Sequence, residues 1–226
     1  RRCHGDLHMR NIVGLEGRPV PFDALEFSER LATCDVLYAL AFLLMDMQQA
    51  NLSVQANRVL NAYFELEPCD EALKGLASLP LFLSLRALVR AVVSADLATG
   101  GGAPEAVQRT DRYLDFSAQA LRRQKPVLYV VAGLSGTGKT TLARELAPQL
   151  SGPCGALLLR SDIERKRMEG VSPTTRLPES AYAKERSEAV YDKLFRKAER
   201  VLATGTSVIL DAVFARPEER KAAEAV

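Results

Sequence analysis

The sequence predicts an α/β domain with a parallel sheet in its C-terminal half, preceded by a mostly α-helical region with a small β-hairpin. Helical periodicity fills much of the chain up to residue 124, and after it continuous apolar runs alternate with helical segments. Alternation of strand and helix is typical of a parallel sheet covered by helices. We therefore expect two domains, 1–124 and 125–226.

The composition is that of a globular protein. Of 226 residues, 47% are hydrophobic and 26% charged, and the formal net charge is +2. This near balance argues against nucleic acid or an anionic membrane as partner. The four cysteines are far apart and form no CxxC pair. A disulfide framework or zinc site is therefore disfavoured, and a cytoplasmic location is expected. The longest apolar run, Val36–Met47, is too short to span a membrane.

The elements expected in residues 1–124 follow from local pattern. Ile12–Leu15 and Arg18–Phe22, joined through Glu16 and Gly17, predict the hairpin. Apolar residues at three- and four-residue spacing then predict helices over Val36–Met47, Val54–Phe64, Leu79–Leu97 and Glu105–Leu121. Gly100, Gly101 and Gly102 with Pro104 are expected to separate the last two helices.

Beyond residue 125 the sequence pattern changes from helical periodicity to continuous apolar runs that alternate with helical segments. Val127–Ala132 is a continuous apolar run, which predicts a strand buried on both faces. A glycine-rich turn and a helix from about Lys139 to Ala147, closed by Pro148, are expected next. Further strands are expected at Ala156–Leu159 and Ser207–Leu210, with a helix opening at Ser161 and a long amphipathic helix from Glu179 to Ala203 between them.

Residues 133–140 read GLSGTGKT and match the P-loop pattern G-x-x-x-x-G-K-[ST] in full. Glycines let backbone N–H groups wrap a phosphate, and a side chain at Gly138 would obstruct that approach. Lys139 is expected to reach the outer phosphates of ATP, and the Thr140 hydroxyl to ligate Mg²⁺. A chance glycine-rich loop is disfavoured, because the motif lies between an expected strand and an expected helix. The predicted nucleotide-binding residues are Gly133, Leu134, Ser135, Gly136, Thr137, Gly138, Lys139, Thr140 and Thr141.

Two acids follow the later strands. Asp211 comes directly after an apolar run, at the strand end where ligands gather in open parallel sheets, and we favour a magnesium role over a turn or cap role. Ser161-Asp162-Ile163-Glu164 fits a capping box with Ser161 as N-cap and Asp162 as an acid in the first turn. Asp162 also lies where a phosphate acceptor would bind. It is a candidate to orient or deprotonate an acceptor hydroxyl, with Arg165 on the same helical face to bind an anionic substrate.

These motifs give residues 126–226 a resemblance to P-loop kinases of the group that includes polynucleotide 5′-kinases, zeta toxins, gluconate kinase and chloramphenicol phosphotransferase. The matching features are the GLSGTGKT loop, the Ser161-Asp162-x-x-Arg165 segment and the strand ending in Asp211. The resemblance implies that Asp162 serves the acceptor hydroxyl. It also implies that later strands and a lid would follow Val226, so we expect a fragment of a longer protein.

A second chemical signal lies near the start of the chain. Asp6 and Asn11 are five residues apart, the spacing of the catalytic base and the magnesium-binding asparagine in H-R-D-x-x-x-x-N kinase loops. Asp23 follows the second hairpin strand, where a metal-binding acid is expected. The stretch from His4 to Asn11 resembles aminoglycoside phosphotransferases and choline kinase-like enzymes, whose loop reads HGDxHxxN. That resemblance implies that residues 1–124 form a kinase C-terminal lobe whose N-terminal lobe is absent.

Other charged residues near these motifs have simpler interpretations. His4 is expected to hold its loop by hydrogen bonds, and the role of His8 is left open. Arg86 and Arg90 share a helical face and are candidates to bind an anion, although surface pairing with acids such as Asp96 or Glu105 is favoured.

The motifs together predict an ATP-dependent phosphotransferase that uses Mg²⁺, with Asp6, Lys139 and Asp162 as catalytic candidates and Asn11, Asp23, Thr140 and Asp211 as metal ligands. The phosphate acceptor and the oligomeric state are not encoded in any recognisable pattern. The alternative is a nucleotide-dependent regulatory ATPase without a small-molecule acceptor. A third interpretation is that the N-terminal half is only a structural remnant.

Overall fold

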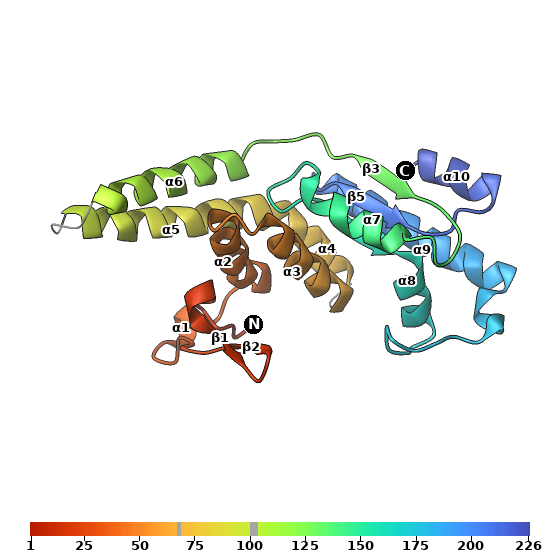
Figure 1. The fold of residues 1–226 in the computed structure, drawn as a ribbon, viewed down its shortest axis with the longest axis horizontal. Helices are drawn as coiled ribbons and strands as arrows, with labels where there is room; N and C mark the ends of the chain where they lie inside the picture. Colours follow the sequence, from red (N-terminus) through yellow and green to blue (C-terminus); the bar gives the residue numbers. More distant parts are fainter. Residues whose placement is uncertain (67–68, 100–103) are drawn as a thin grey trace. The chain divides into compact units, whose positions relative to one another are not determined.

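The computed structural model describes residues 1–66, 69–99 and 104–226 (Figure 1). The chain divides into two compact units. The N-terminal unit contains Arg1–Val59 and Gly75–Arg123, and the P-loop unit contains Leu60–Lys74 and Gln124–Val226. The P-loop unit therefore includes a segment from far upstream in the sequence. The expected separator at Gly100–Gly102 lies outside the described residues.

The predicted hairpin is confirmed in the N-terminal unit. Strands β1 (Ile12–Leu15) and β2 (Arg18–Pro21) pair antiparallel, with Leu15 opposite Arg18. The connecting Glu16 and Gly17 have φ angles of 51° and 74°, as a two-residue type I′ turn requires. Phe22, expected to end the second strand, lies just beyond it, and its amide donates a 2.9 Å hydrogen bond to the Asn11 carbonyl.

The four predicted helices of this half are confirmed to within two residues at each end. They are α2 (Val36–Gln49), α3 (Ser53–Leu66), α5 (Leu79–Thr99) and α6 (Pro104–Ala120). The unit also contains the short helices η1 (Met9–Asn11), α1 (Glu29–Ala32) and η2 (Leu76–Ser78). Asp35 caps α2 by accepting a hydrogen bond from the Leu37 amide at 2.8 Å.

One helical stretch is long and apolar enough to cross a membrane. Asp70–Thr99, which runs through α4 (Asp70–Gly75), η2 and α5, meets this test by length and composition, with 39% of its apolar window buried. A core helix passes the same test. Part of α5 has the surroundings of a core helix: Leu83 and Ala87 are fully buried, and the Ser84 hydroxyl is 2.8 Å from the Ser117 hydroxyl on α6.

The P-loop unit contains a three-stranded parallel sheet. Its strands β3 (Leu128–Val131), β4 (Leu157–Arg160) and β5 (Val208–Asp211) lie in the order β3-β5-β4. The unit's helical elements are the part of α3 from Leu60 on, α4, α7 (Lys139–Leu146), η3 (Ala147–Gln149), α8 (Ser161–Met168), η4 (Glu179–Tyr182), α9 (Lys184–Ala203) and α10 (Pro217–Glu224). Helices α7, α8 and α9 contact the sheet, and one core cluster joins Val131, Ala143, Ala147, Ala156, Leu158 and Ile209.

Three local expectations for the P-loop unit are wrong. The first run forms an outer strand rather than one buried on both faces: Val130 of β3 is 42% exposed, while every residue of the central β5 is buried. Ser161 does not cap α8; Arg160 is the N-cap, with extended backbone, and Ser161 is already helical. The helix expected from Glu179 is interrupted at Ala183, whose ψ of 154° separates η4 from α9.

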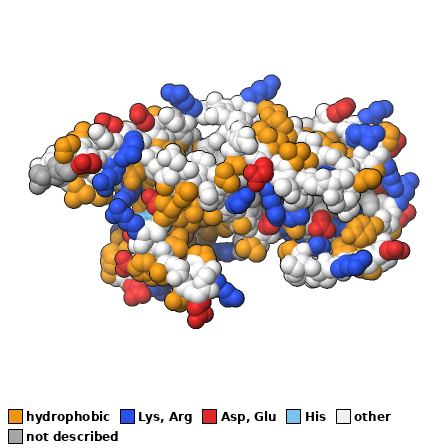
Figure 2. All heavy atoms as spheres, viewed as in Figure 1, with side chains coloured by type: hydrophobic (Ala, Val, Ile, Leu, Met, Phe, Trp, Pro, Cys, Tyr) orange, Lys and Arg blue, Asp and Glu red, His pale blue; other side chains and the backbone are white. Residues whose placement is uncertain are grey.

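On the face of the molecule drawn in Figure 2, basic and acidic side chains are interspersed. This agrees with the near-balanced composition of 30 basic and 28 acidic residues.

Candidate nucleotide site

The P-loop connects β3 to the N-terminus of α7. Gly138, the N-cap of α7, has a φ of 84°, a left-handed conformation that favours glycine. Gly133 has a φ of 149°, and a Cβ built on it would lie 3.0 Å from the Thr137 hydroxyl oxygen. The loop therefore needs glycine for its backbone conformation at Gly138 and for space at Gly133. The result is a turn of backbone amides at a helix N-terminus, which is an anion-binding arrangement.

Lys139 lies over this loop. Its Nζ donates a hydrogen bond to the Leu134 carbonyl at 2.5 Å, and the Thr137 hydroxyl donates to the same carbonyl at 2.8 Å. The ammonium group is thus held within the loop, where it adds a positive charge to the amide dipoles. This is where the sequence motif expects a cation for the outer phosphates.

Thr140 and Asp211 meet directly. Thr140 is the second residue of α7 and Asp211 the last residue of β5, and the Thr140 hydroxyl donates a hydrogen bond to Asp211 Oδ2 at 2.5 Å. Asp211 is 5% exposed. Hydroxyl and carboxylate oxygens are ligands that Mg²⁺ accepts, so this pair fits a magnesium ion completed by phosphate and water oxygens. Within the described ranges, no group of three or more His, Cys, Asp or Glu side chains forms a metal site.

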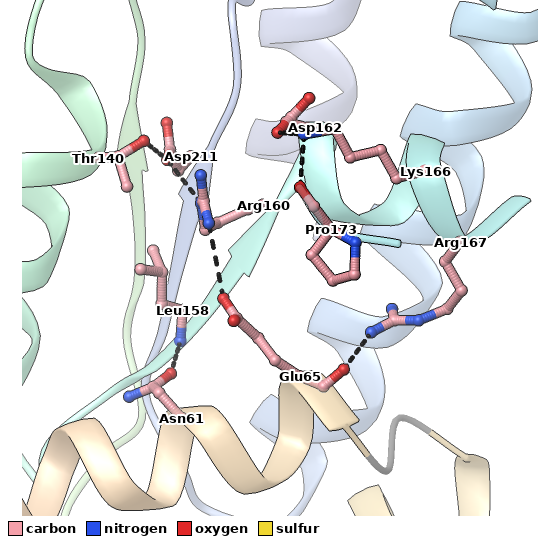
Figure 3. Close-up of polar contacts among 10 residues, drawn as sticks. All are labelled: Asn61, Glu65, Thr140, Leu158, Arg160, Asp162, Lys166, Arg167, Pro173 and Asp211. Carbon is pink, nitrogen blue, oxygen red and sulfur yellow. Dashed lines mark hydrogen bonds and ion pairs between the residues drawn. The ribbon is translucent and has the colours of Figure 1, made fainter. Parts of the chain in front are cut away.

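The structure adds Arg160 to this site, a residue that sequence reasoning missed. In the parallel register, Arg160 of β4 is the partner of Asp211 of β5. Its Nε lies 3.5 Å from Asp211 Oδ2 (Figure 3). The signal in the sequence that could have found it is that Arg160 directly follows the apolar run Ala156–Leu159, because strand ends meet at one edge of a parallel sheet.

Asp162 and Arg165 both line the cleft beside the P-loop, but each already has a partner. Asp162 Oδ2 accepts a 2.9 Å hydrogen bond from Lys166, which also donates to the Pro173 carbonyl at 2.7 Å (Figure 3). Arg165 is buried, donates to the Ala181 carbonyl at 2.6 Å, and lies 4.8 Å from the centre of the Tyr182 ring. Asp162 is therefore the more accessible of the two.

The cleft has a volume of about 730 Å³. Besides P-loop residues it is lined by side chains that no motif indicated, among them Tyr191, Arg216 and Glu219. The Tyr191 hydroxyl accepts a 2.9 Å hydrogen bond from the amide of Phe214, whose φ is 49°. Burial raises the pKa of Tyr191; the Phe214 hydrogen bond lowers it in part, and Glu219 raises it further. Tyr191 therefore lines the cleft as a neutral side chain, and its hydroxyl holds the turn after β5 in place.

The N-terminal constellation is partly assembled. Asn11 is buried, and its Nδ2 donates to the Asp6 carbonyl at 3.0 Å and to Asp6 Oδ2 at 3.3 Å. His8 Nε2 lies 3.5 Å from Asp6 Oδ2. Asp23 is exposed, has a φ of 60°, and makes no hydrogen bond or ion pair within the described residues. The structure therefore brings Asp6, Asn11 and His8 together and leaves Asp23 out of their contacts.

Two expectations about neighbouring cations come out differently. His4 holds its loop as predicted, with Nε2 2.8 Å from the Phe22 carbonyl oxygen. The prediction that Arg86 pairs with acids at the surface is wrong. This side chain is buried, donates to the Gly5 carbonyl at 3.4 Å, and lies 4.0 Å from the centre of the Tyr38 ring. Arg86 therefore supports the loop that carries Asp6, because the helix face it occupies is covered by that loop. Arg90 stands 5.9 Å from the centre of the Tyr113 ring.

Comparison with known proteins relates the C-terminal half to a family. Residues 128–226 match the family model described as an AAA domain, a P-loop family that includes kinases. Curated relatives are an uncharacterized protein of Mycobacterium bovis and uncharacterized proteins of two Mycobacterium tuberculosis strains. Each is 32% identical over 224 residues, which is 97% of this chain and 43% of the relative's length. The chain thus spans less than half of these relatives. No solved structure shows a significant match.

Proposed function

We propose that the P-loop unit binds ATP with Mg²⁺ and transfers the γ-phosphate to a hydroxyl group of an acceptor bound in the adjoining cleft. The contact between Thr140 and Asp211 carries this proposal. It joins the P-loop helix to the end of the central strand at 2.5 Å, as a magnesium site beside a nucleotide's phosphates requires.

The remaining roles follow from position. The amides of residues 133–140 and the Lys139 ammonium would hold the phosphates, and Thr140 and Asp211 would hold Mg²⁺, which offsets charge on the phosphate oxygens. Asp162 accepts the proton of the acceptor hydroxyl. The acceptor oxygen forms a bond to the γ-phosphorus while the bond from phosphorus to the bridging oxygen breaks, and ADP leaves. Arg165 and Arg216, which line the same cleft, favour an anionic acceptor.

For the N-terminal unit we propose the role that its resemblance implies. Asp6 is the proton acceptor of a second phosphotransfer site, with Asn11 and Asp23 as metal ligands. The hydrogen bonds from Asn11 to Asp6 support the first two assignments.

The test of the nucleotide site is the variant Lys139→Ala, measured by calorimetry with Mg²⁺-ATP. Loss of one cation from the phosphate cradle should lower affinity by about a hundredfold or more. The matched control is Lys221→Ala, which removes one exposed cation from α10. Equal affinity in both variants would refute the nucleotide site.

A second candidate function is a nucleotide-dependent regulatory ATPase without a small-molecule acceptor. It is favoured by the contacts that already engage Asp162 with Lys166 and Arg165 with Ala181. The discriminating assay follows label from γ-labelled ATP into sugars, nucleosides, antibiotics and oligonucleotide ends. ATP turnover without transfer to any of them favours the regulatory ATPase.

A further inference from the structure

We infer that Glu65, a residue outside the AAA domain match, tunes the magnesium dependence of the nucleotide site by competing with Asp211 for Arg160. The inference rests on the proposed nucleotide site and deepens it. Arg160 is the positioning residue in this scheme. Its guanidinium lies between two acids, with Nε 3.5 Å from Asp211 Oδ2 and Nη1 3.7 Å from Glu65 Oε1 (Figure 3).

Arg160 is enclosed but incompletely bonded. Its side chain is 16% exposed and lines the nucleotide cleft. Its Nε is buried and makes no hydrogen bond to any residue in the described ranges. The carboxylate oxygens of Glu65 and Asp211 lie at ion-pair distances from the Arg160 nitrogens and not at hydrogen-bond distances, so neither acid forms a hydrogen bond with the guanidinium. The guanidinium can therefore move toward either acid without breaking a hydrogen bond to the other.

Glu65 is held in place by its surroundings in the P-loop unit. The Arg167 guanidinium donates a 3.0 Å hydrogen bond to the Glu65 carbonyl (Figure 3). One helical turn earlier, the Asn61 side-chain amide accepts a hydrogen bond from the Leu158 amide of β4 (Figure 3) and donates one to the Ala156 carbonyl just before that strand. Beyond α3, Asp70 pairs with Arg200 of α9. The carboxylate of Glu65 is therefore presented to Arg160 by an anchored segment and not by a loose surface side chain.

The charges of this region balance. Three cations (Arg160, Arg167 and Lys197) face three acids (Glu65, Glu164 and Asp211). The buried Glu164 forms ion pairs with Arg167, at 2.7 Å, and with Lys197. Within this group, Arg160 is left with Glu65 and Asp211 as its acids. Removing the Glu65 charge leaves Asp211 as the sole acid of the group for Arg160.

The chemical consequence concerns Mg²⁺. A guanidinium paired with Asp211 competes with the metal for the same carboxylate, so the pairing weakens Mg²⁺ binding. Without Mg²⁺, the same guanidinium offsets repulsion between Asp211 and the nucleotide phosphates. Glu65 draws Arg160 away from Asp211 and so favours the metal-bound state.

The test measures ADP affinity by calorimetry, with Mg²⁺ and with a chelator at matched ionic strength, in the full 226-residue chain. The ratio of the two affinities is the magnesium enhancement. Glu65→Gln should lower this ratio about five- to tenfold, a coupling of ordinary size. Arg160→Gln should weaken chelator-phase ADP binding about five- to tenfold and raise the ratio. In the double variant, the Glu65 substitution should have no further effect. Glu71→Gln, an exposed acid in the same segment, is the matched control.

The result that overturns the inference is a magnesium enhancement in Glu65→Gln equal to that of the control, or a Glu65 effect that persists undiminished in the Arg160→Gln background. Lys139→Ala distinguishes this outcome from failure of the proposed nucleotide site. If the nucleotide site is wrong, ADP affinity is intact in Lys139→Ala; if only the role of Glu65 is wrong, ADP affinity is still lowered in Lys139→Ala. Thermal unfolding is measured for each variant to check that it folds. If Glu65→Gln fails to fold, Glu65→Asp, which withdraws the charge by one methylene, should lower the ratio in the same direction by a smaller factor, and an unchanged ratio there also refutes the inference.

Discussion

The side-chain amide of Asn61 pairs with the edge of the P-loop sheet at Leu158. Asn61 Oδ1 accepts a hydrogen bond from the Leu158 amide at 2.7 Å, and Asn61 Nδ2 donates to the Ala156 carbonyl at 3.2 Å. Strand β4 is an outer strand in the order β3-β5-β4. The amide thus satisfies backbone groups that a neighbouring strand would otherwise bond, and it covers an edge open to pairing with another chain.

Replacing Asn61 by Ala should destabilise the P-loop unit by about 1–3 kcal/mol, because it removes the hydrogen-bond acceptor of the buried Leu158 amide. Urea unfolding gives the free energy, and hydrogen exchange at the Leu158 amide locates the effect. Gln55→Ala, at an exposed position on the same helix, is the control and should change stability little. Equal exchange rates at Leu158 in both variants would contradict the prediction.

Gly138→Ala should fold and lose nucleotide affinity. No heavy atom lies within 4 Å of a Cβ built at Gly138, so the stability cost is the left-handed backbone alone, about 1–2 kcal/mol. The added methyl group occupies the space in front of the α7 amides where a phosphate is expected. Thermal unfolding and ADP calorimetry measure the two effects. Gly14→Ala, also without a close neighbour and without a positive φ, is the comparison and should keep full affinity. Retained ADP affinity in Gly138→Ala would count against the proposed phosphate position.

Asp162→Asn should separate transfer from binding. If Asp162 takes the acceptor proton, the transfer rate falls about 10²–10⁴-fold, while the affinity for Mg²⁺-ATP is unchanged. Label transfer to an accepted substrate gives the first quantity and calorimetry the second, with the exposed Asp115→Asn as control. A parallel loss of nucleotide affinity would assign Asp162 to nucleotide binding instead.

Lys197 should give an alkaline stability signature. Burial lowers its pKa below the ordinary 10.5, with Glu164 offsetting part of the effect. Between the folded-state pKa and 10.5 the unfolded chain binds more protons at this site, so stability rises with pH there. The stability of the wild type relative to Lys197→Met should therefore increase as the pH rises towards 10.5. Urea unfolding across this range checks the slope, and a falling difference would show that the pairing with Glu164 outweighs burial.

Local signals predicted much of the fold and the nucleotide loop. The hairpin turn at Glu16 and Gly17, four helices of the N-terminal half and the strand–turn–helix around Lys139 each follow from neighbours in sequence. Contacts set by the sheet order were not accessible in this way. The central place of β5 determines that Val130 is exposed and that Arg160 faces Asp211, and no local pattern encodes that order.

Long-range packing accounts for the other differences. Arg86 has an ordinary surface pattern on its helix, yet the loop of Gly5 covers it. Asn61 and Glu65 are polar residues of an amphipathic helix, and nothing in their neighbours indicates a partner nearly a hundred residues away.

The upstream segment Leu60–Lys74 makes the nucleotide-binding unit discontinuous in sequence. A truncation at residue 125 would carry every residue of the P-loop motif and still be missing part of its own domain. Such a shortened chain would expose the outer strand β4 and remove the ion pair between Glu65 and Arg160. We therefore expect it to be produced in poor yield or to respond differently to Mg²⁺. Expression and grafting experiments on this module should therefore keep the helix that ends at Leu66.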